Sequence, residues 1–236
     1  MIHQKGLGLP EIMISLFLTG FILSTLMSVY ISTKQHVHKL QMNLDDDMEL
    51  MVVTDVMRDS IQQAGFTPCS NIDYLIHDKD LVAIHIGEGL RPTLQINRMG
   101  PQYEPISQMI DATHVMTASN AVVHTKHPVL IADCYHAEVH HVKTITLMQD
   151  GQRLSFEEPI VYQYQPPVFI GDWISERFYI RAGGGLFYER FHRDELTPLV
   201  QTMQLDGDAR SGKPFLRVTL GLTSSRVFDF QTRVRS

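Results

Sequence analysis

The sequence is poor in cysteine and in positive charge, and it lacks the short motifs of common enzyme classes. Its 236 residues include 2 cysteines, and the formal net charge is −6. An acidic chain is poorly suited to non-specific binding of nucleic acid, so we expect no nucleic acid among its partners. The nucleophile elbow G-x-S-x-G, the P-loop, the H-E-x-x-H motif and the dinucleotide-binding fingerprint are all missing. We therefore expect that the protein is not an enzyme.

Charge is also missing from one long stretch near the N-terminus. The 20 residues from Ile12 to Ile31 contain no charged side chain, and a single carboxylate, Glu11, precedes them. As a helix this run is about 30 Å long, which is the thickness of a bilayer's hydrocarbon core. It is too long for a secretory signal peptide and has no small-residue cleavage site after it. An acid costs about 2.5–3.5 kcal/mol at the bilayer centre, so the pattern predicts a transmembrane helix with a functional Glu11.

The residues that lead into this run, Lys5-Gly6-Leu7-Gly8-Leu9-Pro10-Glu11, resemble the class III signal of type IV pilins and type II secretion pseudopilins. The resemblance implies that a prepilin peptidase cleaves between Gly6 and Leu7 and methylates the new amino terminus of Leu7. It also implies that Glu11 acts in assembly. Leu7 replaces the usual Phe and Pro10 the usual aliphatic residue, but a proline in the first helical turn loses no hydrogen bond. The alternative, a plain signal anchor, explains the hydrophobic run but not the positions of Gly6 and Glu11.

The helical pattern continues beyond the membrane run. Apolar residues recur at intervals of three and four from Val37 to Ala64, and charged residues occupy the opposite face. Gly65 is a natural stop, and Pro68 follows it. The pattern predicts one helix from about Pro10 to Ala64, roughly 80 Å long at 1.5 Å per residue.

After Gly65 the sequence changes to short apolar runs separated by turns. The glycines at 183–185 lie between two of these runs and predict a hairpin. The chain has no Gly-Ser linker and no internal repeat, so we expect one domain after the helix. The predicted fold class is α+β, with a long N-terminal helix packed on an antiparallel, β-rich head. The predicted strands are residues 81–86, 129–134, 137–148, 160–164, 178–181, 186–191, 215–222 and 227–234.

The expected parts are a leader (1–6), a transmembrane helix half (7–31), an amphipathic helix half (32–65) and a globular head (66–236). Along most of the chain this order resembles the PilW family of minor pilins, and a J-type pseudopilin of type II secretion is a close structural relative. The resemblance implies a pilin-like fold. The motifs that carry it are QAGF at 63–66 with Cys69, IADC at 131–134, LFYER at 186–190 and LTPLV at 196–200.

The two cysteines, Cys69 and Cys134, lie in the predicted head. A membrane segment whose short basic leader stays in the cytoplasm places the rest of the chain outside it, where disulfides form. Two cysteines allow one internal bridge, and their spacing does not resemble a metal-thiolate or redox motif. We therefore expect a Cys69–Cys134 disulfide, with a pair of buried free thiols as the alternative.

The 12 histidines are the other candidates for chemistry. His136, His140 and His141 lie close together, but a strand at 137–148 sends His140 and His141 to opposite faces. His136 and His140 share a face only with each other and have no convincing third ligand. We expect no metal and no cofactor.

These observations lead to the hypothesis of a PilW-type minor pilin. It would help to initiate a type IV pilus and be incorporated into it, in a tip complex with other minor pilins. The expected partners are those minor pilins, the major pilin, the prepilin peptidase and the inner-membrane assembly platform. The expected location is the inner membrane, single-pass with the head in the periplasm, and then the pilus at the cell surface. A type II secretion pseudopilin and a membrane-anchored periplasmic binding module are the alternatives.

Overall fold

The computed structural model describes residues 8–77, 81–87, 89, 91–118, 123, 125–207 and 215–234. Within these ranges a long N-terminal apolar helix is followed by antiparallel strands, so the architecture is α+β as predicted. The chain divides into two compact units, residues 1–51 and residues 52–236.

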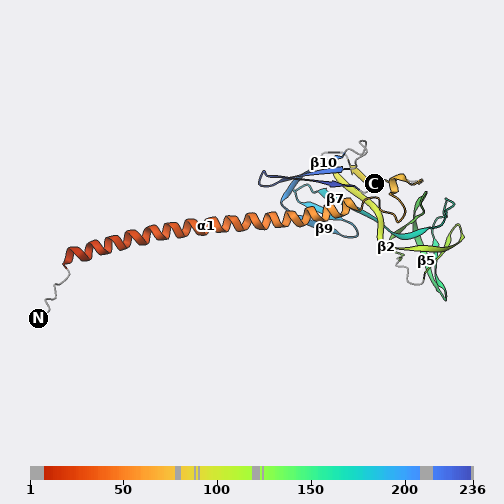
Figure 1. The fold of residues 1–236 in the computed structure, drawn as a ribbon, viewed down its shortest axis with the longest axis horizontal. Helices are drawn as coiled ribbons and strands as arrows, with labels where there is room; N and C mark the ends of the chain where they lie inside the picture. The colour runs from red at the N-terminus through yellow and green to blue at the C-terminus, as the bar shows by residue number, and fades with distance from the viewer. Residues whose placement is uncertain are drawn as a thin grey trace. The chain divides into compact units, whose positions relative to one another are not determined.

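The helix α1 (Leu9–Gln62) forms one uninterrupted coil and matches the predicted helix closely (Figure 1). It is long and apolar enough to cross a membrane, and the apolar side chains of its first half are exposed. Two hydroxyl groups inside this half donate to carbonyl groups of the helix itself. Thr19 Oγ1 donates to the Ser15 carbonyl at 2.7 Å, and Thr25 Oγ1 donates to the Ile22 carbonyl at 2.8 Å. A segment surrounded by lipid needs such internal partners, because no water is available there.

The larger sheet of the second unit contains a closed ring. Its strand order is β1-β2-β3-β6-β5-β4-β7-β8-β9, and β2 also pairs with β7. Six strands, β2, β3, β6, β5, β4 and β7, therefore pair in a circle, and buried side chains such as Val115, Ile131 and Leu154 form one core cluster. The bounds are β1 (Ile84–Gly87), β2 (Thr93–Asp111), β3 (His114–Thr117), β4 (Pro128–Ala132), β5 (Ala137–Met148), β6 (Gly151–Phe156), β7 (Phe169–Ile180), β8 (Leu186–Glu189) and β9 (Arg193–Thr197).

A second, three-stranded sheet packs beside the last turns of α1. It has the order β10 (Val200–Gly207), β11 (Phe215–Leu222) and β12 (Val227–Arg233). Val53, Met57 and Ile61 recur every four residues on one helix face and are buried. The Arg58 guanidinium lies 5.5 Å from the centre of the Phe230 ring on β12. This end of the helix is thus part of the head's core.

Several predicted strands are confirmed and others are wrong. The bounds of β5, the β7–β8 hairpin across Gly183–Gly185 and the final β11–β12 pair agree with the prediction. The strand predicted at 160–164 is absent, because the N–H groups of Val161 and Tyr162 bind the Glu138 carboxylate instead of a neighbouring strand. The strands β2, β3, β6, β9 and β10, and the first part of β7, were not predicted. In β2, Pro101 falls within a register shift between Met99 and Tyr103, where a missing N–H costs no ladder bond.

Gly65 makes the turn at which the chain leaves α1 and enters the head. Its φ of +70° lies in the left-handed region that favours glycine. Its N–H donates to the Asn97 carbonyl at 2.8 Å, and its own carbonyl accepts the Ile72 N–H at 2.9 Å. A Cβ at this position would overlap the Asn71 side-chain oxygen and lie 2.7 Å from the Ala83 Cβ. Both conformation and space therefore require glycine here.

We predict that Gly65→Ala lowers the free energy of unfolding by at least about 2 kcal/mol, because it combines left-handed strain with steric overlap. The matched control is Gly183→Ala. A Cβ at Gly183 meets nothing within 4 Å, so the change should stay within about 0.5 kcal/mol. Denaturant titration of the full chain in detergent micelles, followed by fluorescence of the single tryptophan, Trp173, measures both. Equal stability of the two variants would show that the turn at residue 65 does not depend on glycine.

Candidate functional site

The first candidate site is the start of α1. Gly6 and Leu7, the predicted cleavage and methylation positions, lie outside the described residues, whereas Glu11 is described. The Gly8 N–H donates to Glu11 Oε2 at 3.0 Å, and the Glu11 N–H donates to the Gly8 carbonyl at 3.0 Å. This reciprocal pair resembles a capping box, and a carboxylate in the first turn also interacts favourably with the helix dipole. Glu11 therefore has a partner within its own helix.

Downstream of Glu11 the helix presents a long apolar surface. The side chains of Phe17 and Phe21, for example, are 74% and 63% exposed. Contiguous exposed apolar surface of this extent marks a contact with lipid or with another protein. Further along the same unit Val37, Leu40, Leu44 and others are also exposed.

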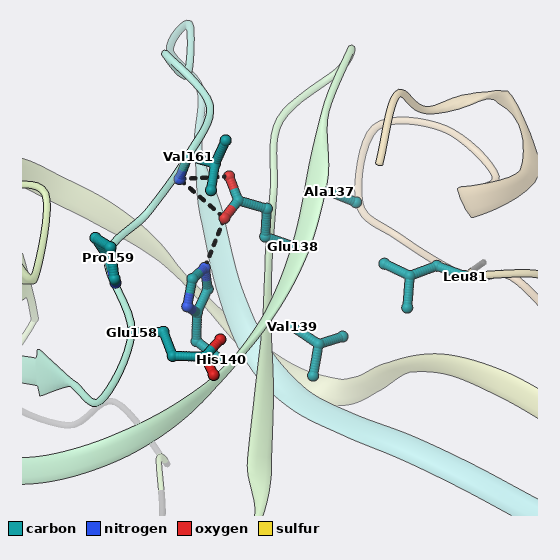
Figure 2. A pocket seen from close by; sticks show the side chains of 8 residues that line it. All are labelled: Leu81, Ala137, Glu138, Val139, His140, Glu158, Pro159 and Val161. Atoms are coloured by element: carbon teal, nitrogen blue, oxygen red, sulfur yellow. Dashed lines mark hydrogen bonds and ion pairs between the residues drawn. The ribbon is translucent and has the colours of Figure 1, made fainter. Parts of the chain in front are cut away.

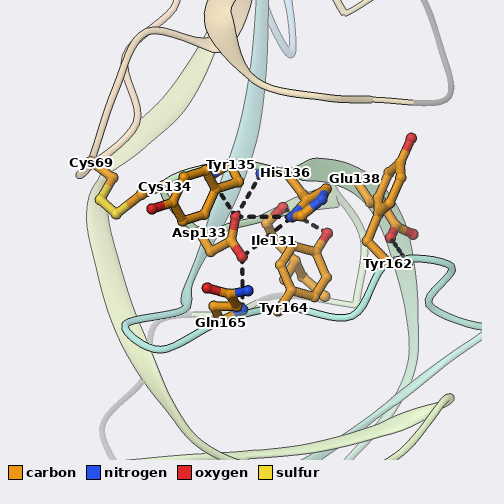
Figure 3. Close-up of polar contacts among 10 residues, drawn as sticks. All are labelled: Cys69, Ile131, Asp133, Cys134, Tyr135, His136, Glu138, Tyr162, Tyr164 and Gln165. Atoms are coloured by element: carbon orange, nitrogen blue, oxygen red, sulfur yellow. Dashed lines mark hydrogen bonds and ion pairs between the residues drawn. A yellow bond between two sulfur atoms is a disulfide. The ribbon is translucent and has the colours of Figure 1, made fainter.

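The second candidate site surrounds the disulfide in the head. Cys69 and Cys134 are bonded to each other, with their Cα atoms 5.0 Å apart (Figure 3). The bond joins the loop after α1 to the turn after β4, across 65 residues of sequence. In loop-entropy models a bridge of this span stabilises the folded state by roughly 4 kcal/mol.

Asp133, the residue before Cys134, is fully buried and holds two segments together. Its Oδ1 accepts the backbone N–H groups of Tyr135, at 2.7 Å, and of His136, while its Oδ2 accepts the N–H of Gln165 at 2.8 Å (Figure 3). Burial raises the pKa of the Asp133 carboxyl, but these hydrogen bonds outweigh burial and leave the pKa below its usual value. The carboxylate therefore stays ionised inside the protein.

Glu138, on β5, plays the same part a few residues further on. Its carboxylate accepts the backbone N–H groups of Val161, at 3.1 Å, and Tyr162, at 2.7 Å. His140 Nε2 lies 2.8 Å from Glu138 Oε2, and both side chains are buried (Figure 2). Burial raises the pKa of Glu138, but the hydrogen bonds from His140, Tyr162 and Val161 together lower it below its usual value. These bonds explain why residues 160–164 do not form a strand.

Aromatic side chains lie beside these two carboxylates. The His136 ring stacks on Tyr162 with centroids 4.9 Å apart, and the Tyr164 hydroxyl donates to the Ile131 carbonyl at 3.3 Å (Figure 3). Burial, together with the nearby carboxylates of Glu138 and Asp133, raises the pKa of the Tyr164 phenol far above its usual range. Tyr164 is therefore a permanent hydroxyl donor, not a proton carrier at physiological pH.

Both carboxylates of this cluster have a structural role, since each accepts two or more backbone N–H groups. Among the described residues no group of three or more His, Cys, Asp or Glu side chains is arranged to hold a metal ion. His140 is buried and His141 is exposed, so the two lie on opposite faces of β5, as the strand period predicts.

A buried charge pair within the large sheet, between β2 and β7, also contacts the residue after α1. Arg98 Nη2 lies 2.9 Å from Glu176 Oε1, and Arg98 Nη1 donates to Gln63 Oε1 at 2.7 Å. The exposed fractions of the two charged side chains are 8% and 2%. Burial and the neighbouring Glu176 raise the pKa of the Tyr188 phenol to about 12. Removing one partner of such a pair is strongly destabilising, because the other charge stays buried.

Comparison of the chain with protein-family models, with curated proteins and with solved structures found no match in any of the three. The interpretation of both sites therefore depends on their own geometry. Sequence reasoning did not single out Asp133 or Glu138 as carboxylates that bind backbone groups, nor Arg98 and Glu176 as a pair. One signal was available for Glu138, since an acid between Ala137 and Val139 in an apolar strand is unusual unless it is paired.

We predict that Glu138→Gln destabilises the protein in a pH-dependent way. The folded pKa of Glu138 is below its ordinary value of 4.5, so its stabilising effect is complete above that pH. The effect is lost as the pH falls through the lower folded value. At about pH 7 the variant should lose about 2 kcal/mol of unfolding free energy, because the two backbone donors and His140 lose an anionic acceptor.

The same titration near pH 3 should show a much smaller difference between the variant and the parent, since Glu138 is then largely protonated in the unfolded chain. Glu157→Gln is the matched control, because Glu157 is exposed and its change should stay within about 0.5 kcal/mol. A loss of stability that is the same at both pH values would show that the charge of Glu138 is not its source.

Proposed function

We propose that the protein is a minor pilin of the PilW type, which helps to initiate a type IV pilus and is incorporated into it. One observation carries the proposal: a single carboxylate, Glu11, opens a continuous helix whose next 20 residues are uncharged. Glu11 is the fifth residue after the predicted cleavage between Gly6 and Leu7. A membrane anchor alone needs neither the acid nor this spacing.

The first half of α1 has two successive environments in this proposal. Before assembly it crosses the inner membrane, with the head in the periplasm. Its length, its lack of charge and its internally bonded hydroxyls are suited to lipid. After assembly the same surface packs against the corresponding helices of other subunits in the core of the filament.

In this mechanism Glu11 fixes the axial position of one subunit relative to its neighbour. Its carboxylate pairs with the methylated amine of Leu7 on a neighbouring subunit. Each lone charge is costly in an apolar medium, and each neutralises the other. The hydrogen bond from the Gly8 N–H to Glu11 supports the proposal, because it gives the carboxylate one donor within the same subunit before the subunit is assembled.

The head makes the lateral contacts with other minor pilins, the major pilin and the assembly platform. A head used in this way must keep its shape while its helix leaves the membrane. The disulfide and the buried carboxylates Asp133 and Glu138 provide such rigidity, since they hold loops that no strand holds.

The first prediction from this function concerns processing. In membranes from cells with an active prepilin peptidase, mass spectrometry should find a chain that begins at N-methyl-Leu7. Gly6→Trp should block the cut, because a bulky side chain replaces the glycine before the scissile bond. Gly8→Ala is the control and should be cut normally, since a Cβ there lies 3.5 Å or more from its nearest neighbours. Recovery of intact Met1 from the unsubstituted protein would rule the proposal out.

The second prediction separates the charge of Glu11 from its role as a helix cap. Glu11→Ala removes both the charge and the acceptor for the Gly8 N–H, whereas Glu11→Gln removes the charge but keeps an acceptor oxygen. Both variants should insert and be cleaved, because Gly6 and the apolar run are unchanged and a neutral residue is easier to insert. Both should fail to support normal pilus assembly, because the amine of Leu7 on the neighbour would lose its partner.

The measurement is complementation of a deletion strain, with surface filaments counted and crosslinks to partner pilins quantified in the membrane. If Glu11→Gln assembles as well as the parent and Glu11→Ala does not, helix capping is the function of Glu11 and the register mechanism is wrong. Normal assembly of both variants would remove Glu11 from the mechanism altogether.

A further inference from the structure

The three-stranded sheet of the head ends in a strand that is paired on one side only. Its order is β10-β11-β12, so β12 is bonded to β11 along one edge and to no strand of the described part of the chain along the other. Every second side chain from Val227 to Arg233 is exposed, and Phe230 and Thr232, which lie between them, are buried. One face of β12 therefore belongs to the core, and the opposite face is exposed.

The backbone of β12 directs hydrogen-bonding groups to its outer edge. The Leu222 N–H donates to the Arg226 carbonyl at 2.9 Å, so these residues form a hydrogen-bonded pair at the turn between β11 and β12. Bonded and non-bonded pairs alternate along an antiparallel ladder, and the register of these strands has no shift. Residues 227, 229, 231 and 233 are therefore non-bonded toward β11, and their N–H and C=O groups point outward. None of these groups bonds to another described residue.

The exposed face of β12 carries one acid and one base at matched positions. Asp229 and Arg233 lie two residues to either side of Gln231, and neither forms an ion pair with another residue that the structure describes. A row of unpaired backbone groups is a template for an added strand. If a second copy of β12 pairs antiparallel and centred on Gln231, its Arg233 lies opposite Asp229 and its Asp229 lies opposite Arg233. The edge is therefore complementary to itself.

Other registers of this pairing lose the match of charges. Pairing centred on Asp229 or on Arg233 places two like charges directly opposite each other, which is destabilising. Pairing centred on Phe230 or on Thr232 leaves each charge opposite an uncharged residue. The register centred on Gln231 forms two pairs of opposite charge, and each directly opposite pair exchanges two backbone hydrogen bonds.

We propose that two copies of this protein associate through the outer edges of their β12 strands. The strands pair antiparallel about Gln231, so that the two small sheets become one continuous sheet. Asp229 of each copy forms an ion pair with Arg233 of the other. Such a contact uses the same surface on both copies and closes on itself as a dimer. The site goes beyond the proposed pilus function, because it gives the head a contact that involves neither Gly6 nor Glu11.

The first test measures association of the full chain in detergent micelles by sedimentation equilibrium. The parent should form dimers as its concentration rises. Asp229→Arg and Arg233→Asp, each alone, place like charges opposite each other at both ends of the contact, so each should weaken the dimer at least about tenfold. An equal mixture of these two variants should dimerise about as well as the parent, because their charges are then complementary.

Asp206→Arg is the matched control for these variants. It makes the same change of charge at an exposed position of the same sheet, but on β10 and away from the β12 edge. Its dimerisation should equal that of the parent. All of the changed side chains are exposed, so the variants should fold.

The second test locates the contact by crosslinking. In the proposed register Gln231 lies opposite Gln231 of the second copy, with about 5.5 Å between the two Cα atoms. A short bismaleimide should therefore join two copies of the Gln231→Cys variant. It should not join copies of Val227→Cys, because residue 227 of the second copy is about 26 Å away along the strands. Cys69 and Cys134 are bonded to each other and should not react.

Three outcomes would overturn the proposal. A parent that stays monomeric at every concentration would leave the β12 edge to a strand of a different protein. Equal association of the parent and the two single variants would place the contact elsewhere, for example between the helices. Crosslinking of Val227→Cys as efficient as that of Gln231→Cys would rule out this register. None of these outcomes bears on cleavage at Gly6 or on assembly through Glu11, so the dimer and the pilus function fail or stand separately.

Discussion

The head depends on backbone N–H groups that bind buried carboxylates where no strand is available. The chain between β6 and β7, residues 157–168, must cross from one part of the closed ring to another without a strand of its own. Asp133 and Glu138 bind three N–H groups of this segment, at Gln165, Val161 and Tyr162. Buried backbone donors must be paired, and an ionised acceptor bonds more strongly than a neutral one. The two carboxylates thus supply the hydrogen-bond acceptors that a neighbouring strand would otherwise provide for this segment.

The features that sequence alone predicts are those set by local chemistry. The uncharged run, the four-residue periodicity of Val53, Met57 and Ile61, and the stop at Gly65 each follow from one short stretch, and α1 agrees with them. The β5 strand and the hairpin at Gly183–Gly185 are local in the same sense. The unpredicted strands have a different origin. β2 contains Gly100, Pro101 and Pro105, and the strand is held by three neighbours along its length: β1 and β7 at its start, β7 in its middle and β3 at its end.

The two sites differ in the same way. Glu11 stands out in the sequence because the 20 residues after it are uncharged. Glu138 and Arg98 become notable only when β5 and β2 have partners, since the residues that they bind are 23 and 78 positions away. Periodicity cannot report contacts of that range. It also predicted a strand at 160–164, where apolar character was real but the hydrogen-bond partners were carboxylates.

The closed ring has a consequence for how copies of this protein can associate. A sheet grows by adding strands to its free edges, and a ring removes the edges of the strands within it. The terminal strands of the large sheet in the described part of the chain are β1 and β9, of four and five residues. β1 is short, and β9 is short and begins with the charged residues Arg193-Asp194-Glu195, so both edges resist pairing with a strand of another copy. The large sheet of the head is thus protected against edge-to-edge pairing between copies of the chain, so its hydrogen-bonded strands all belong to one molecule.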